Sequence, residues 1–112
     1  MKLSVVIITY NEQDILDACL NSVSFADEIV IIDGGSEDKT QEIGKRHGAK
    51  IYRVDTNDFS VKRNSGKDKS LGEWILYIDA DERVSVELKN NILKTINSTS
   101  LKKAYKIKRK NF

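Results

Sequence analysis

The hydrophobic residues of this chain are concentrated in three short runs that are almost wholly apolar and rich in β-branched side chains. They cover residues 5–8, 29–32 and 74–78 and read VVII, IVII and WILYI. Such runs are typical of central strands in a parallel sheet, because other elements cover both faces of those strands. A shorter run at 50–54 predicts a fourth strand.

Apolar residues at helical spacing occupy the segments between these runs. Asp38 and Gln41 have the spacing of a capping box, which predicts the start of a helix that stops at Gly48. Because strand and helix alternate, the chain predicts an α/β fold, a mostly parallel sheet flanked by helices and joined by right-handed crossovers. The expected helices cover about residues 12–23, 38–48 and 60–69, and a fourth begins after Ser85 and ends in the polar stretch at 97–100.

The composition is that of one soluble, globular domain. The 112 residues are 39% hydrophobic and 32% charged, and no apolar run approaches the roughly 18 residues that a membrane span needs. The N-terminal stretch has no small-residue cleavage site, and Asn11 and Glu12 interrupt its apolar run. We therefore expect neither a signal peptide nor a membrane span.

Two residues with reactive side chains are expected to carry no chemistry. Cys19, the only cysteine, lies in an apolar series with helical spacing, which predicts a buried structural thiol. His47 lies in the last turn of a predicted helix, where a cation is favourable.

The net charge of +2 is unevenly distributed, because six positive and no negative charges lie between Lys102 and Lys110. The rest of the chain is therefore net acidic. The alternation at 104–108 favours an edge strand guarded by lysines. A basic surface that meets an anionic acceptor or membrane headgroups is the alternative. Nucleic-acid binding is disfavoured, because the body is acidic and the tail has no aromatic residue beyond Tyr105 until its last position.

Polar residues follow each of the three strong strands, and ligands of open α/β sheets bind beyond the carboxyl ends of the strands. Asp79-Ala80-Asp81 is the most informative of these endings. Two carboxylates one residue apart can both turn toward a hard divalent cation, which would offset charge on a diphosphate leaving group. The alternative is that one of them only caps a turn. The other two endings read TYNE at 9–12 and DGGS at 33–36.

The segment at 33–40 reads DGGSEDKT, and its two glycines allow a close backbone approach. It lacks both the GK[ST] ending of a phosphate-binding loop and the G-x-G-x-x-G spacing of a dinucleotide fold. Ser36 and Asp38 are expected to be helix caps, whereas Asp33 is a candidate acceptor of hydrogen bonds from a base or ribose.

Lys62-Arg63-Asn64 lies on the third predicted helix. A solvated charged face is the ordinary interpretation of such a segment. In the alternative, Arg63 reaches donor phosphate or base, since its planar guanidinium suits oxyanions. The residues alone leave these two interpretations equally open.

Taken together, four segments resemble glycosyltransferase family 2, the inverting enzymes of GT-A fold. The resemblance covers essentially the whole chain, and the pattern is closest to the bacterial subgroup that adds glucose to the lipopolysaccharide core. The matching segments are VVIITYNE at 5–12, ADEIVIIDGGSEDKT at 26–40, KRNSG at 62–66 and GEWILYIDADERVS at 72–85.

The resemblance implies a Rossmann-like half that binds a nucleotide-sugar, and it implies a role for each matching residue. Asp81 would be the main ligand of Mn²⁺ or Mg²⁺, with Asp79 beside it contacting ribose and sugar. Asp33 would bind the base with Arg63 close to it. The nucleotide pocket would be lined by Thr9, Tyr10 and Glu12.

In the family, the general base that deprotonates the acceptor normally lies well after the D-x-D triplet. No residue of this chain is assigned that role, so residues 1–112 are expected to form one donor-binding domain that ends before the acceptor-binding half. We expect weak donor binding at best and little or no transfer. A fragment, a truncated gene product and one part of a split enzyme all fit this expectation.

The resemblance also implies partners: a nucleotide-diphospho-sugar, most simply a UDP-sugar, and a glycan or lipid-linked acceptor of bacterial surface polysaccharide or lipopolysaccharide synthesis. The expected location is the cytoplasm, including the inner face of the membrane. Exposed strand edges predict a homo-oligomer. A non-catalytic nucleotide- or metal-binding remnant or subunit is the main alternative function. A phosphohydrolase is disfavoured, since its D-x-D pair usually follows the first strand and here it follows the fourth.

Overall fold

The computed structural model describes residues 1–97 and the strand at 107–109. Strands and helices alternate along the described chain, as the hydrophobic pattern predicts. The elements are β1 (Leu3–Thr9), α1 (Leu16–Ser22), β2 (Glu28–Asp33), α2 (Thr40–Arg46), β3 (Lys50–Arg53), α3 (Phe59–Lys69), β4 (Trp74–Asp79), α4 (Val86–Ile96) and β5 (Ile107–Arg109).

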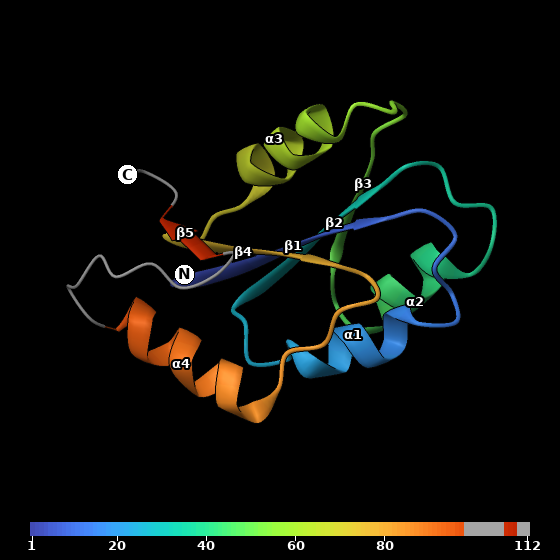
Figure 1. Cartoon of the computed structure of the whole chain (residues 1–112). Coiled ribbons are helices and arrows are strands. Elements are labelled where there is room, and N and C mark those ends of the chain that lie inside the picture. Colours follow the sequence, from blue (N-terminus) through green and yellow to red (C-terminus); the bar gives the residue numbers. More distant parts are fainter. Residues whose placement is uncertain (98–106, 110–112) are drawn as a thin grey trace.

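The sheet has the strand order β3-β2-β1-β4-β5 (Figure 1). β3, β2, β1 and β4 are parallel, and β5 runs antiparallel to β4. The predicted α/β fold with a mostly parallel sheet is therefore confirmed. Part of the predicted tail strand is confirmed as β5, while residues 98–106 and 110–112 lie outside the described part of the chain.

Helices cover both faces of this sheet: α1, α2 and α4 lie on one face and α3 lies alone on the other (Figure 1). The larger apolar core lies on the face of α1, α2 and α4 and includes Val5, Ile7 and Ile31. A smaller core, which includes Val6 and Ile32, lies on the opposite face. Burial of each of these aliphatic side chains stabilises the fold by about 1.5–3 kcal/mol. Successive side chains of a strand point to opposite faces of the sheet, so the residues of β1 and β2 alternate between the two cores.

The first helix begins later than predicted, at Leu16 rather than near residue 12. Residues 11–15 form a loop in which Asn11 has a positive φ of 53°. The backbone N–H of Glu12 donates to the Thr40 hydroxyl at 2.8 Å. The Glu12 carbonyl accepts from Ile15 N at 3.1 Å and from Leu16 N at 3.0 Å, so residues 13–15 form a turn that leads into α1.

The second helix begins at Thr40, and the predicted capping box does not form. The Gln41 side chain instead donates to the Asp33 carboxylate at 3.0 Å. The helix ends at Arg46, and Gly48 has a φ of 76°, which suits a glycine after a helix. The position of the helix is therefore confirmed but its capping mechanism was wrong.

The last two helices agree closely with the prediction. Asp58 caps α3 by accepting from the N–H groups of Ser60 and Val61. Ser85 caps α4 by accepting from Leu88 N–H at 3.0 Å. No helix in the described part of the chain is long and apolar enough to cross a membrane.

A buried polar network joins the strands at the opposite edge of the sheet, where they begin. The Glu28 carboxylate is almost fully buried and accepts from Ser4 Oγ at 2.6 Å, from Leu71 N at 2.8 Å and from Lys50 Nζ at 2.7 Å. Burial by itself raises the pKa of Glu28, but these hydrogen bonds outweigh it and leave the pKa lowered. The network ties β1, β2 and β3 to the segment that enters β4.

Candidate functional site

The three strands that carry the candidate residues end side by side. Thr9 is paired with Asp33 across β1 and β2, and Ile8 is paired with Asp79 across β1 and β4. The predicted gathering of these strand ends at one edge of the sheet is confirmed. The individual side chains at that edge nevertheless point to different faces.

Thr9 and Asp33 point into the layer of α1 and α2 and are almost completely buried. Asp33 accepts hydrogen bonds from Thr9 Oγ1 at 2.7 Å, from Gly35 N at 3.0 Å and from Gln41 Nε2 at 3.0 Å. It also accepts from the backbone and hydroxyl of Ser36, at 2.7 and 2.6 Å. Both oxygens are thus engaged within the chain.

This environment keeps Asp33 ionised and makes it the anchor of the turn after β2. Burial raises the pKa of Asp33, but the hydrogen bonds from Ser36, Thr9 and Gln41 outweigh it, so the pKa is lowered. The side-chain contact of Asp33 with a base stays a prediction, and it would require one of these internal hydrogen bonds to be exchanged. The structure itself gives Asp33 an ordering role.

The loop after β1 and the loop after β2 are joined by reciprocal hydrogen bonds. The N–H of Asn11 donates to Ser36 Oγ at 2.7 Å, and the Asn11 side chain accepts from Glu37 N at 2.9 Å. Asp38 accepts from Gln13 N at 3.2 Å. The expectation that Ser36 is a helix cap was wrong, because its hydroxyl bonds to Asn11 and Asp33 and not to α2. Asp38 both connects the loops and accepts from the N–H of Thr40, the first residue of α2, at 2.9 Å, although Lys39 has the N-cap position. The two loops therefore form one structural unit.

The D-x-D triplet forms an exposed turn whose carboxylates are unengaged. Asp79 N donates to the Glu82 carboxylate at 2.7 Å, and Glu82 N donates to the Asp79 carbonyl at 2.9 Å. Glu82 therefore closes this turn, and neither the Asp79 nor the Asp81 carboxylate accepts a hydrogen bond from another described residue. Their oxygens are accordingly available to a ligand.

Glu12 adds a third carboxylate to this surface. Burial raises the pKa of Glu12, and the charges of Asp81, Asp38 and Asp79 raise it further, against the lowering effect of a hydrogen bond to the Tyr10 backbone. Neighbouring like charges disfavour the ionised form of each carboxylate. A bound cation would relieve that repulsion.

A complete protein-built metal centre is absent from residues 1–97: no three His, Cys, Asp or Glu side chains gather there closely enough to hold an ion. Mg²⁺ in nucleotide sites is commonly held by one or two carboxylates together with phosphate oxygens and waters. The unengaged oxygens of Asp79 and Asp81 fit that kind of ion, with the remaining positions left to the ligand.

Cys19 of α1 contacts this turn, and the prediction that its thiol is buried and structural is confirmed. Its Sγ donates to the Asp79 carbonyl at 3.8 Å. Burial raises the pKa of Cys19 to about 11, so the thiol is not a nucleophile at neutral pH. His47, as expected, has a structural contact: its Nε2 lies 2.7 Å from Asp17 of α1.

Arg63 and Tyr10 flank the edge on the α3 side. The Arg63 guanidinium lies 5.3 Å from the Phe59 ring and 5.4 Å from the Tyr77 ring, which fixes it over the end of β4. Strand alternation places Asp79 on the same face as Tyr77. Tyr10 is 54% exposed.

From the sequence, Lys62 was noted only as part of the charged segment Lys62-Arg63-Asn64 and not as a candidate site residue. Its ammonium and the Tyr10 ring both lie close to Gly34. No local signal in the sequence separates Lys62 from Arg63, because only the packing of α3 on the sheet determines which of the two faces the end of β2.

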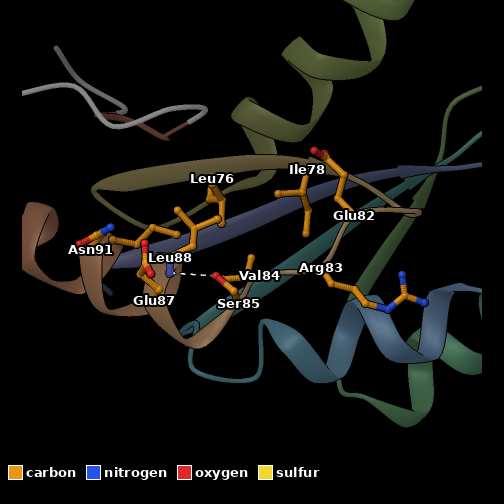
Figure 2. A pocket seen from close by; sticks show the side chains of 10 residues that line it. Leu76, Ile78, Glu82, Arg83, Val84, Ser85, Glu87, Leu88 and Asn91 are labelled. Carbon is orange, nitrogen blue, oxygen red and sulfur yellow. Dashed lines mark hydrogen bonds between the residues drawn. The ribbon is translucent and has the colours of Figure 1, made fainter.

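A pocket of about 310 Å³ lies beside the same turn, between β4 and α4 (Figure 2). Its lining includes the apolar side chains of Leu76, Ile78 and Leu88 and the charged side chains of Glu82 and Arg83. Figure 2 shows the Glu82 and Arg83 side chains pointing away from each other.

Comparison with known proteins identifies the class of protein to which this chain belongs. A model of the family described as Glycosyl transferase family 2 matches residues 4–102. An uncharacterized glycosyltransferase of Rickettsia typhi is 35% identical over 92 residues, covering 81% of this chain and 32% of the relative. A TPR repeat-containing protein of Synechococcus elongatus is 39% identical over 88 residues, covering 77% of this chain and 22% of the relative.

Solved structures give the same result. Residues 1–349 of S. aureus TarS, in complex with UDP-GlcNAc, align with a TM-score of 0.74 and 28% identity, over 87% of this chain and 31% of that TarS chain. Glucosyl-3-phosphoglycerate synthase from Mycobacterium tuberculosis, in complex with Mn²⁺, UDP and glucosyl-3-phosphoglycerate, aligns with a TM-score of 0.63 and 21% identity. That alignment covers 70% of this chain and 33% of the synthase, and it supports the fold alone.

The chain belongs to glycosyl transferase family 2. It spans between about a fifth and a third of the length of the relatives named above. The family resemblance found in the sequence is therefore confirmed, whereas the lipopolysaccharide-core subgroup stays a prediction.

Proposed function

We propose that this chain is the donor-binding part of a glycosyltransferase and that it holds a nucleotide-diphospho-sugar, with UDP as the nucleotide, through Mn²⁺ or Mg²⁺ at Asp79 and Asp81. The observation that carries the proposal is the pair of exposed, unengaged carboxylates where β4 ends, next to the strand ends of β1 and β2. The UDP-GlcNAc complex of TarS supports this choice of ligand, and the carboxylate oxygens of Asp79 and Asp81 are the kind of ligand that Mn²⁺ and Mg²⁺ prefer.

Different residues at the ends of the strands bind different parts of the donor. Asp79 and Asp81 supply the cation's protein ligands, and the bound cation offsets charge on the diphosphate. Arg63, held over Tyr77, is placed to approach the donor from the α3 side. The exposed Tyr10 ring offers a flat surface beside the end of β2. Asp33 contributes by ordering the turn that forms the floor of the site.

The reaction proposed for the whole enzyme is inverting transfer of a hexosyl group to a glycan or lipid-linked acceptor. Bacterial surface-polysaccharide or lipopolysaccharide synthesis at the cytoplasmic face of the membrane is the proposed setting. No described residue is assigned the role of general base. We accordingly propose that residues 1–112 alone bind the donor weakly and transfer little or no sugar, and that association into an oligomer accompanies the exposed sheet edges.

Calorimetric titration of UDP into the chain, with and without Mn²⁺, tests the metal-dependent part of the proposal. We expect Asp81→Asn to weaken binding by about tenfold in the presence of Mn²⁺ and to have little effect without it, because one charged ligand oxygen is lost. Glu42→Gln on α2 is the matched control, since Glu42 is exposed and lies outside the edge. Equal binding by wild type and Asp81→Asn at every Mn²⁺ concentration would contradict the proposal.

The same titration separates the alternative function. An independent nucleotide-binding module would bind UDP and Mn²⁺ tightly as the chain alone, whereas a donor-binding part that shares its pocket with further residues would bind them weakly. Sugar transfer by the purified chain would contradict the proposal that it is inactive alone.

A further inference from the structure

Two side chains from different elements converge on Gly34, the first residue after β2. A Cβ atom placed on Gly34 would lie 3.2 Å from Lys62 Nζ and 3.5 Å from Cδ1 of Tyr10. The Gly34 N–H donates to the Thr9 carbonyl at 2.9 Å, which holds this backbone against the end of β1. An ammonium group and an aromatic ring therefore share the space above a residue that has no side chain.

The Lys62 ammonium is not neutralised by its surroundings. The side chain is half-buried, yet it forms no hydrogen bond or ion pair with any residue in the described ranges. Two neighbouring cations are engaged: Arg53 Nε donates to both oxygens of Asp55, and Arg63 lies over two aromatic rings. Lys62 thus presents free donors to whatever occupies the space beside Tyr10.

The distance from the carboxylates indicates which part of a nucleotide would reach Lys62. Gly34 follows β2 and Asp79 ends β4, with β1 lying between these two strands. Neighbouring strands lie about 4.8 Å apart, so the two strand ends are separated by about 10 Å. Ribose separates the base of a nucleoside diphosphate from its diphosphate. A ligand whose diphosphate lies at Asp79 and Asp81 would accordingly bring its base, not its phosphates, to Gly34.

We propose that Lys62 donates a hydrogen bond to the 4-carbonyl oxygen of the base and thereby selects uracil over cytosine; this inference rests on the proposed function. An ammonium group only donates, so it pairs with the 4-carbonyl oxygen of uracil and meets a second donor at the 4-amino group of cytosine, whereas the 2-carbonyl oxygen is common to both bases. A site built to pair with one hydrogen-bonding group rejects an analogue that lacks it, because a partner is left unpaired. Gly34 keeps the space open, since a Cβ there would push the ammonium aside.

The test is an NMR titration of the ¹⁵N-labelled chain with UDP, CDP and uridine in the presence of Mg²⁺. The variants are Lys62→Met, Gly34→Ala and, as a matched control, Lys67→Met, which removes an exposed lysine of the same helix. We expect wild type to bind UDP about tenfold more tightly than CDP, in keeping with one hydrogen bond from a charged donor. Lys62→Met should abolish this preference and weaken uridine binding, and Gly34→Ala should reduce the preference while leaving Lys62 in place. Lys67→Met should retain it.

Three outcomes would overturn the inference. Equal affinity of wild type for UDP and CDP would show that the base carbonyl is not recognised. Equal weakening of UDP and CDP by Lys62→Met, with uridine binding unchanged, would assign Lys62 to the phosphates instead. An unchanged preference in Lys62→Met would assign base selection to other residues. Failure of wild type to bind any of the nucleotides would instead contradict the proposed function, which keeps the two conclusions separate.

Discussion

The backbone N–H of Asp79 donates to the side chain of Glu82 at 2.7 Å, and this hydrogen bond closes the turn that carries the D-x-D carboxylates. The Glu82 N–H returns a hydrogen bond to the Asp79 carbonyl at 2.9 Å. Glu82 thereby takes the role of turn cap that the sequence left open for Asp79 or Asp81. Glu82 is consequently a positioning residue for both carboxylates.

Glu82→Ala should therefore weaken Mn²⁺-dependent UDP binding about three- to tenfold, because a net hydrogen bond of about 1 kcal/mol no longer holds the turn. Glu82→Gln should bind like wild type, since its amide oxygen can still accept from Asp79 N–H. Calorimetry on both variants checks this. If Glu82→Gln lost as much affinity as Glu82→Ala, the charge of Glu82 rather than its hydrogen bond would be responsible.

A second prediction concerns the buried Asp33 carboxylate. Asp33→Asn replaces one carboxylate oxygen, which accepts hydrogen bonds, by an amide NH₂ group, which donates them. The buried NH₂ group would then lie against the backbone N–H groups of Gly35 and Ser36, which are donors too. We expect a loss of about 3 kcal/mol in the free energy of unfolding, measured by urea denaturation at pH 7. Glu37→Gln, an exposed change in the same loop, should lose almost nothing.

The same variant has a pH signature. The pKa of Asp33 is lowered in the folded chain, and its unfolded value is about 3.9. The ionised form therefore stabilises the fold fully above that unfolded pKa, and this contribution is lost as the pH falls through the lower folded pKa. The stability difference between wild type and Asp33→Asn should shrink between pH 5 and strongly acidic pH. A difference that stayed constant would show that Asp33 does not titrate as described.

The strands were predictable because their signal is local. Continuous β-branched runs at 5–8, 29–32 and 74–78 are explained only by burial on both faces, and β1, β2 and β4 extend each run by no more than two residues at either end. The helix at 86–96 was equally clear, since Ser85 caps it and its apolar residues share one face. In these segments local preference and tertiary packing agree.

The start of α1 and the capping of α2 were not predictable, because they depend on contacts between distant loops. The Thr40 hydroxyl accepts a hydrogen bond from the backbone N–H of Glu12, and the Gln41 side chain donates one to the Asp33 carboxylate. A capping-box spacing cannot reveal that a stronger acceptor lies eight residues away in the chain. The local signal was outweighed by tertiary hydrogen bonds.

The sequence predicted that the candidate residues gather at one end of the sheet, but it did not predict which of their side chains are exposed. Alternation along β1 and β2 puts Thr9 and Asp33 on the face of Ile7 and Ile31, but only the fold shows that α1 and α2 cover this face. The same lack of tertiary information concealed Lys62. The unengaged carboxylates of Asp79 and Asp81 agree with the sequence-based hypothesis of a metal site, whose occupancy stays a prediction.

The buried thiol supplies a further prediction. With a pKa of about 11 and no exposed surface, Cys19 should react negligibly with iodoacetamide in the folded chain at pH 8. The urea-unfolded chain should react at the rate of an ordinary thiol. Mass spectrometry of the alkylated protein over time checks this. Rapid modification under native conditions would contradict the burial of Cys19 beneath the D-x-D turn.

The last prediction concerns Gly66, which lets α3 approach the sheet closely. A Cβ on Gly66 would lie 2.4 Å from Cγ1 of Val6, well inside contact distance. Glycine to alanine in a helix is normally favourable by about 1 kcal/mol. Here the overlap reverses the sign, and we expect Gly66→Ala to lower the free energy of unfolding by about 1–3 kcal/mol, as overpacking does.

A double-mutant cycle assigns this loss to the Gly66–Val6 contact. Val6→Ala alone should destabilise the chain, because it removes buried methyl groups of the core beneath α3. Adding Gly66→Ala to Val6→Ala should cost much less than adding it to wild type, since the overlapping methyl groups are gone, and the coupling should exceed about 1 kcal/mol. Gly48→Ala is unsuitable as a control because its positive φ introduces separate strain, whereas Gly34→Ala tests a glycine whose nearest neighbour is a flexible lysine end. Additive losses in the cycle would show that α3 is free to shift away from the sheet and that the close packing of Gly66 on β1 does not determine its position.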